Sequence, residues 1–349
     1  MYNLKSMTMK KQLITLVFMV LAFGLYGQST IHSLVQKGIE YHDNQQYSEA
    51  IKTYKLALAI DSKSPLANYE IAMTYFYTKA YKRSIKHLNK VLKQKNDYLL
   101  DAYNAKAACL DYMGKQNKAI KTYKKALEIF SNSFLLNYNL GFTYYNIENY
   151  KEADKCLMNA IALNPNHAKS HLILGLSKYS QKKRIKSLLS LYYFLFLDAG
   201  SKNASQALNI IKKQRATCVS VDPSSNSNSI NILPQSDATF ATADMLLCLI
   251  EASKKRPERN GKRPGRPFAE ETRKFFQALG ELKKENATGL WWNRYVPFFY
   301  KLSQTEHFET FWHYIGACEC EKDAAWLNTN EGKFKRFISW ASQNRIEKE

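Results

Sequence analysis

The densest group of side chains that could do chemistry lies near the C-terminus. His307, His313, Cys318 and Cys320 fall within 14 residues, and imidazole and thiolate are ligands that zinc prefers. Their spacing, H-x5-H-x4-C-x-C, matches no common zinc module, and a disulfide between residues two apart would be strained. The four residues are candidate metal ligands, but we expect them to pack as ordinary side chains.

Catalytic signatures are absent from the sequence. We find no phosphate-binding glycine loop, no nucleophile elbow and no HExxH metalloprotease motif. Carboxylate pairs cannot be told apart from ordinary surface charge. We therefore expect a protein that is not an enzyme and binds no cofactor. The alternative is an enzymatic or metal-binding module in residues 216–349.

The chain is strongly basic, with a formal net charge of +21. Residues 254–267, KKRPERNGKRPGRP, resemble an AT-hook, but the usual Arg-Gly-Arg-Pro core is here Pro-Gly-Arg-Pro. We expect a solvated basic linker and no nucleic-acid partner. The positive charge favours acidic partners, or peripheral contact with an anionic membrane surface.

Residues 1–27 are typical of a secretory signal peptide. Met9-Lys10-Lys11 precede an apolar run from Leu13 to Phe23, and the small Gly27 precedes polar sequence. The run is short for a membrane span, and the segment resembles the signals of secreted Bacteroidota proteins. We expect cleavage after Gly27 and a periplasmic or secreted protein, with an uncleaved, membrane-anchored form as the alternative.

A period of 34 residues organises the elements that follow. Small residues recur at spacings of 34, 35, 34 and 34, at Gly38, Ala72, Ala107, Gly141 and Gly175. Each period predicts two amphipathic helices of about 14 residues, which in the fourth unit cover 134–147 and 150–163. Small residues stand where the two helices must approach closely, and large ones such as Leu157 fill the gaps between them.

These units resemble the tetratricopeptide repeat (TPR). Five units follow one another, at 31–64, 65–99, 100–133, 134–167 and 168–198. The resemblance implies a right-handed α-solenoid in which the stacked helix pairs share a continuous core.

The rest of the chain is expected to be mainly helical, which makes the fold class mainly all-α. The second helix of the fifth unit is apolar on all sides from Leu188 to Leu197, so we expect it to pack against the C-terminal region. We expect a capping helix in 199–215, a short β-hairpin and a helix in 216–253, and an aromatic-rich helical region in 268–349. The domain boundary is placed near residue 216.

The resemblance also implies a binding surface. In TPR proteins the first helices of the repeats line a concave face, and the positions carried over to this chain are mainly aromatic: Tyr69, Met73, Phe76, Tyr77, Asn104, Tyr112, Tyr138, Phe142, Tyr145 and Tyr179. Aromatic side chains are common anchors for protein partners. The lysine and asparagine clamp of chaperone-tail-binding TPR proteins is missing.

The expected function is a non-enzymatic scaffold for protein–protein interaction in the cell envelope, which binds a peptide or helix along this face. In the alternative to an open groove, the same aromatic side chains bury against the array's own C-terminal region.

Overall fold

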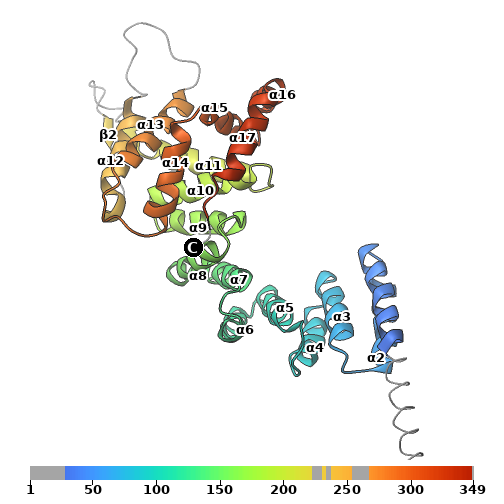
Figure 1. Cartoon of the computed structure of the whole chain (residues 1–349). Coiled ribbons are helices and arrows are strands. Elements are labelled where there is room, and N and C mark those ends of the chain that lie inside the picture. The colour runs from blue at the N-terminus through green and yellow to red at the C-terminus, as the bar shows by residue number, and fades with distance from the viewer. Residues whose placement is uncertain (1–27, 222–229, 233–236, 254–266, 348–349) are drawn as a thin grey trace, which may run out of the picture. The chain divides into compact units, whose positions relative to one another are not determined.

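The computed structural model describes residues 28–221, 230–232, 237–253 and 267–347 (Figure 1). The expected signal peptide and nearly all of the basic linker lie outside the described residues. Internal contacts divide the chain into two compact units, 1–131 and 132–349, called unit 1 and unit 2 below. No helix in the described ranges combines the length and the apolar character needed to cross a membrane.

Unit 1 consists of three helix pairs, one for each of the first three repeats. Residues 28–43 are helical, and the helices that follow are α2 (Tyr47–Ile60), α3 (Pro65–Tyr77), α4 (Tyr81–Val91), α5 (Leu99–Tyr112) and α6 (Gln116–Ile129). Each helix packs on the next, and the first helices of the second and third repeats, α3 and α5, also contact each other. The first helices therefore form one side of unit 1, called its inner face here.

Unit 2 begins with the fourth and fifth helix pairs and continues into the C-terminal region. The pairs are α7 (Phe134–Asn146) with α8 (Tyr150–Leu163) and α9 (Ala168–Ser180) with α10 (Arg184–Asp198). The helices that follow are α11 (Ala204–Ala216), α12 (Ala241–Ser253), α13 (Pro267–Glu281), the π-helical turn η2 (Trp291–Tyr295), α14 (Val296–Ser303), α15 (His307–Gly316), α16 (Glu321–Thr329) and α17 (Glu331–Gln343). The predicted five helix pairs are confirmed within the described residues.

The predicted β-hairpin is present between α11 and α12. Strand β1 (Val219–Val221) pairs antiparallel with β2 (Ile230–Ile232), with Val219 opposite Ile232. A 3-10 turn, η1 (Ala238–Phe240), leads into α12. Alternating β-branched residues on both sides of a Ser/Asn-rich segment account for this element.

The turn inside each repeat has the same backbone conformation. One residue per turn has a positive φ, at Gln45, Lys79, Gly114, Glu148 and Lys182. The next amide N–H donates back into the first helix, as from Ala80 to the Tyr75 carbonyl at 2.7 Å. This hydrogen bond closes a Schellman motif, which ends a helix with a left-handed residue. The 34-residue period is thus visible in the backbone as well as in the sequence.

The small residues of the period allow the two helices of a repeat to approach closely. A Cβ added at Gly141 would lie 2.8 Å from the Leu157 side chain, and one at Gly175 would lie 2.7 Å from Leu191. Real Cβ atoms do not approach that closely, so glycine is required here for steric reasons. The predicted pairing of small and large residues is confirmed at these two positions.

Helix α10 lies at the centre of unit 2. Its Tyr192, Tyr193 and Phe194 side chains are completely buried, and α10 contacts α11, α12, α15 and η2. The predicted packing of this mainly apolar helix against the C-terminal region is confirmed. The aromatic segment that begins at Trp291 belongs to the same core.

The division of the chain differs from the expected boundary near residue 216. The two compact units separate between Ser131 and Asn132. The C-terminal helices pack around α10, and the fifth repeat packs on the fourth through α8 and α9. Repeats four and five therefore belong with the C-terminal region.

Candidate functional site: aromatic faces of the repeats

An aromatic cluster lies on unit 1, where α3, α4 and α5 meet. The Phe76 ring centroid lies 5.7 Å from that of Tyr112 and 5.8 Å from that of Tyr81, and Tyr81 and Tyr112 are stacked at 5.5 Å. Tyr77 contacts Phe76 edge-on at 6.2 Å. Tyr77 is 60% exposed and Tyr112 is 67% exposed. Two large aromatic side chains therefore face solvent beside a partly buried ring.

This cluster contains three residues expected from the sequence and one that was missed. Phe76, Tyr77 and Tyr112 belong to first helices, as the resemblance implied. Tyr81 is the first residue of α4, a second helix, so the carried-over positions could not include it. Tyr47 and Tyr150 hold the same place at the start of the second helices α2 and α8, and this repetition is the sequence signal that could have found Tyr81.

The aromatic face continues along α3 on both sides. Tyr69 stacks on Tyr98 at 5.4 Å, just before α5 begins. His42, from the preceding helix, lies 4.9 Å from Tyr77 and is held by a 2.8 Å hydrogen bond between its Nδ1 and Thr74 Oγ1. Met73 is half-buried against the core cluster that contains Leu88, and Asn104 is half-buried on α5.

Carboxylates border this face and change the acidity of the tyrosines. Burial raises the pKa of Tyr69 to about 12, and the negative charges of Asp101 and Glu70 add to the shift. Burial also raises the pKa of Glu70, with a smaller contribution from Asp43. Asp43, Glu70 and Asp101 therefore lie close enough to the aromatic face to act on it electrostatically.

The expected residues of unit 2 form a smaller group. Tyr138 stacks on Phe142 at 6.3 Å and contacts the His167 ring at 4.7 Å. Tyr145 lies 6.0 Å from Tyr150. These side chains, like Tyr179, are half-buried. In the fifth repeat the C-terminal region covers α9 at His171, which bonds to Tyr295.

The metal candidates near the C-terminus each have other neighbours. The His313 Nδ1 lies 2.8 Å from Asp323 Oδ1, and the His313 ring stacks on Trp326 at 3.8 Å. The His307 ring lies 5.6 Å from that of Trp340.

The two cysteines of this group do not complete a site. The Cys318 thiol donates to the Ile315 carbonyl at 3.2 Å, and Cys320 lies at the N-terminus of α16. In the part of the chain that the structure describes, no three His, Cys, Asp or Glu side chains are grouped to hold a metal ion.

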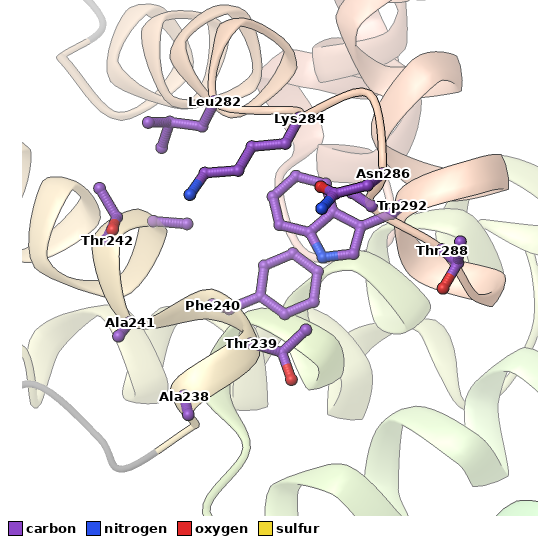
Figure 2. A pocket seen from close by; sticks show the side chains of 12 residues that line it. Ala238, Thr239, Phe240, Ala241, Thr242, Leu282, Lys284, Asn286, Thr288 and Trp292 are labelled. Atoms are coloured by element: carbon purple, nitrogen blue, oxygen red, sulfur yellow. The ribbon is translucent and has the colours of Figure 1, made fainter.

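A hollow of about 400 Å³ lies where η1 faces the segment after α13 (Figure 2). Its floor is the Phe240 ring stacked at 4.4 Å on Trp292, and both side chains are almost completely buried. Its described lining residues include one charged group, Lys284, but no carboxylate, histidine or cysteine.

Comparison with protein families finds the same repeats. A model described as TPR repeat matches residues 38–78 and 112–148, and one described as tetratricopeptide repeat matches residues 134–167. A TPR repeat-containing protein of Methanocaldococcus jannaschii is 28% identical over 127 residues. That alignment covers 33% of this chain and 22% of the relative, so the chain spans about a fifth of that protein's length.

Solved structures with similar repeats match about half of the chain. YrrB, described as a TPR protein with an unusual peptide-binding site, is 19% identical and covers 51% of this chain and 90% of its own, with a TM-score of 0.42. PilW, described as a type IV pilus biogenesis factor, is 18% identical and covers 54% and 91%, with a TM-score of 0.43.

The matches fall on repeats whose turns and helix pairs the structure shows. The chain therefore contains tetratricopeptide repeats, a fold that suggests a scaffold for protein–protein interaction.

Proposed function

We propose that the chain is a scaffold that binds a segment of another protein on the inner face of unit 1. The observation that carries this proposal is the aromatic cluster of Phe76, Tyr77, Tyr81 and Tyr112, in which two tyrosines are more than half exposed. Tyrosine gives a large contact area at low conformational cost and keeps a polar tip, so it suits protein recognition. The first helices α3 and α5 carry Phe76, Tyr77 and Tyr112, and Tyr81 joins them from the start of α4.

The cell envelope is the proposed place of action. The signal-like segment at residues 1–27 supports export of the chain. The half-buried rings of Tyr138 and Tyr145 form a second contact area on unit 2 in this proposal.

A pull-down with the intact chain tests the proposal. The variant Tyr77→Ser with Tyr112→Ser should lose partners that the unchanged protein retains from envelope fractions, because each anchor contributes about 1–3 kcal/mol. Leu56→Ser is the matched control, because Leu56 is 59% exposed but belongs to α2, a second helix.

The control variant should retain the same partners as the unchanged protein. Equal recovery with the tyrosine variant would contradict the proposal, provided that circular dichroism shows both variants to be folded.

A further inference from the structure

Charge in unit 1 is distributed by helix. The first helices, 28–43, α3 and α5, carry five carboxylates and two lysines, a formal charge of −3: Glu40, Asp43, Glu70, Asp101 and Asp111 against Lys37 and Lys106. The second helices, α2, α4 and α6, carry two carboxylates and ten bases, a formal charge of +8: Glu49 and Glu128 against Lys52, Lys55, Lys82, Arg83, Lys86, Lys90, Lys118, Lys121, Lys124 and Lys125. The first helices, which form the inner face of unit 1, are therefore acidic although the chain as a whole is basic.

Three of these carboxylates follow the aromatic face from helix to helix. Asp43 ends the helix of residues 28–43, Glu70 lies in the middle of α3, and Asp101 lies in the first turn of α5. Asp101 and Glu70 both act on Tyr69, and Asp43 acts on Glu70. Asp43 follows His42, whose ring lies 4.9 Å from that of Tyr77. Asp101 lies three residues after Tyr98, which stacks on Tyr69 at 5.4 Å. The negative charges and the tyrosine rings therefore share one surface.

Within the described residues, no ion pair or side-chain hydrogen bond engages Asp43, Glu70 or Asp101. In unit 2, by contrast, two buried carboxylates are paired with cations. Asp154 pairs with Lys178 at 2.5 Å, and Glu251 pairs with Arg215 at 2.5 Å. Glu70 is half-buried and its pKa is raised, so a cation brought beside it would offset the cost of its desolvation. The inner face thus has carboxylates that no cation of the described residues pairs with, exposed at Asp43 and Asp101 and half-buried at Glu70, beside exposed aromatic rings.

We propose that the inner face of unit 1 binds a protein segment rich in lysine or arginine. Its cations pair with Asp43, Glu70 and Asp101 and lie over the rings of Tyr69, Tyr77 and Tyr112. A cation is attracted both to a carboxylate and to the face of an aromatic ring, and this surface offers both within a few residues. This inference rests on the proposed function and names the chemistry of its partner.

The inference reverses the expectation from total charge. A net charge of +21 favours acidic partners, but in unit 1 that charge belongs mainly to the second helices. A partner on the inner face encounters carboxylates at short range, where they outweigh screened charges farther away.

Binding of fluorescein-labelled synthetic peptides to the intact chain tests the inference. Three peptides share one apolar and tyrosine pattern, and their remaining positions are Lys and Arg, Gln, or Glu. In fluorescence anisotropy we expect the Lys/Arg peptide to bind at least about tenfold more tightly than the Gln peptide, and the Glu peptide to bind most weakly. Equal affinities, or no binding of the Lys/Arg peptide, would overturn the inference.

Matched charge variants locate the effect. Glu70→Gln with Asp101→Asn should lower the affinity for the Lys/Arg peptide about tenfold and leave the affinity for the Gln peptide unchanged. Glu49→Gln with Glu128→Gln removes the same charge from second helices and should change neither affinity. Equal weakening by both variants would contradict the inference.

The tyrosine variant separates the two proposals. Suppose that the unchanged protein binds the three peptides with equal affinity and that Tyr77→Ser with Tyr112→Ser weakens the binding of all three. The aromatic docking surface then stands, and the inference on the charge of its partner is wrong. If that variant weakens none of them, the proposed function itself fails.

Discussion

Acidification should destabilise unit 2 through one buried histidine. His171 is completely buried on α9. Its Nε2–H donates to the Pro165 carbonyl at 2.8 Å, and its Nδ1 accepts from the Tyr295 hydroxyl at 2.6 Å. Since a carbonyl can only accept, the Nε2 atom carries a proton, and because burial favours the neutral ring the Nδ1 atom is left to accept.

The structure gives the size of the effect. Burial lowers the pKa of His171 to about 3, whereas an unfolded histidine has a pKa of about 6.5. The unfolded chain therefore binds the proton first, so this contribution to stability is complete above about pH 6.5 and declines as the pH falls towards about 3. Between pH 7 and pH 4.5 the loss is about 2.5 kcal/mol.

Urea unfolding followed by tryptophan fluorescence isolates unit 2, because all five tryptophans lie between Trp291 and Trp340. His171→Gln removes the titrating group and leaves the other ionisable groups in place. The free energy of unfolding of the unchanged protein should fall by about 2.5 kcal/mol more than that of the variant over this pH range. If the unchanged protein and the variant lose the same stability over this pH range, the assignment of His171 as a neutral buried histidine is wrong.

Four further substitutions test the turns and the core. Gly114 has φ +71°, and a Cβ added there would meet nothing within 4 Å. Gly114→Ala should therefore lower the free energy of unfolding by about 1 kcal/mol through backbone strain alone, whereas Lys79→Gly at the equivalent turn should raise it by up to about 1 kcal/mol. Urea unfolding followed by circular dichroism measures both changes, and changes of equal sign would contradict the turn assignment. Arg215→Met should cost about 3–5 kcal/mol because it breaks the buried ion pair between Arg215 and Glu251. Adding Glu251→Leu should recover most of that loss in tryptophan-monitored unfolding, and equal loss in the single and double variants would refute the explanation.

The repeats could be predicted from the sequence because one period fixes both packing and turns. A small residue at the position of Gly141 and a large one at the position of Leu157 recur in every unit, so helices α7 and α8 could be placed to within a residue of their observed ends. A repeated register is evidence that a single amphipathic segment does not offer.

The C-terminal region could be predicted only in part. Its apolar segments indicated helices, and the all-apolar face of α10 indicated a partner. Which helices surround α10 depends on single long-range pairs, such as His171 with Tyr295, that no period reveals. The contact of the fifth repeat with this region was expected from α10, but the separation of the two compact units between Ser131 and Asn132 was not.

The aromatic face was predicted in type but not in membership. Tyr81 and Tyr98 lie outside the first helices, and their stacking on Tyr112 and Tyr69 follows from the path of the turns between helices. The sequence also could not show that Glu70 forms no ion pair within the described residues, because the positions of charges along a chain do not reveal which of them come into contact.

Site-specific photo-crosslinking in intact cells tests the central claim most directly. A photoreactive phenylalanine analogue replaces Tyr112 on the inner face or, as the control, Leu56 on a second helix. The account predicts a covalent adduct with another protein at position 112, with the crosslinked partner peptide rich in Lys or Arg, and little at position 56. Equal adducts at both positions, or none at 112, would contradict a docking surface on the inner face of unit 1.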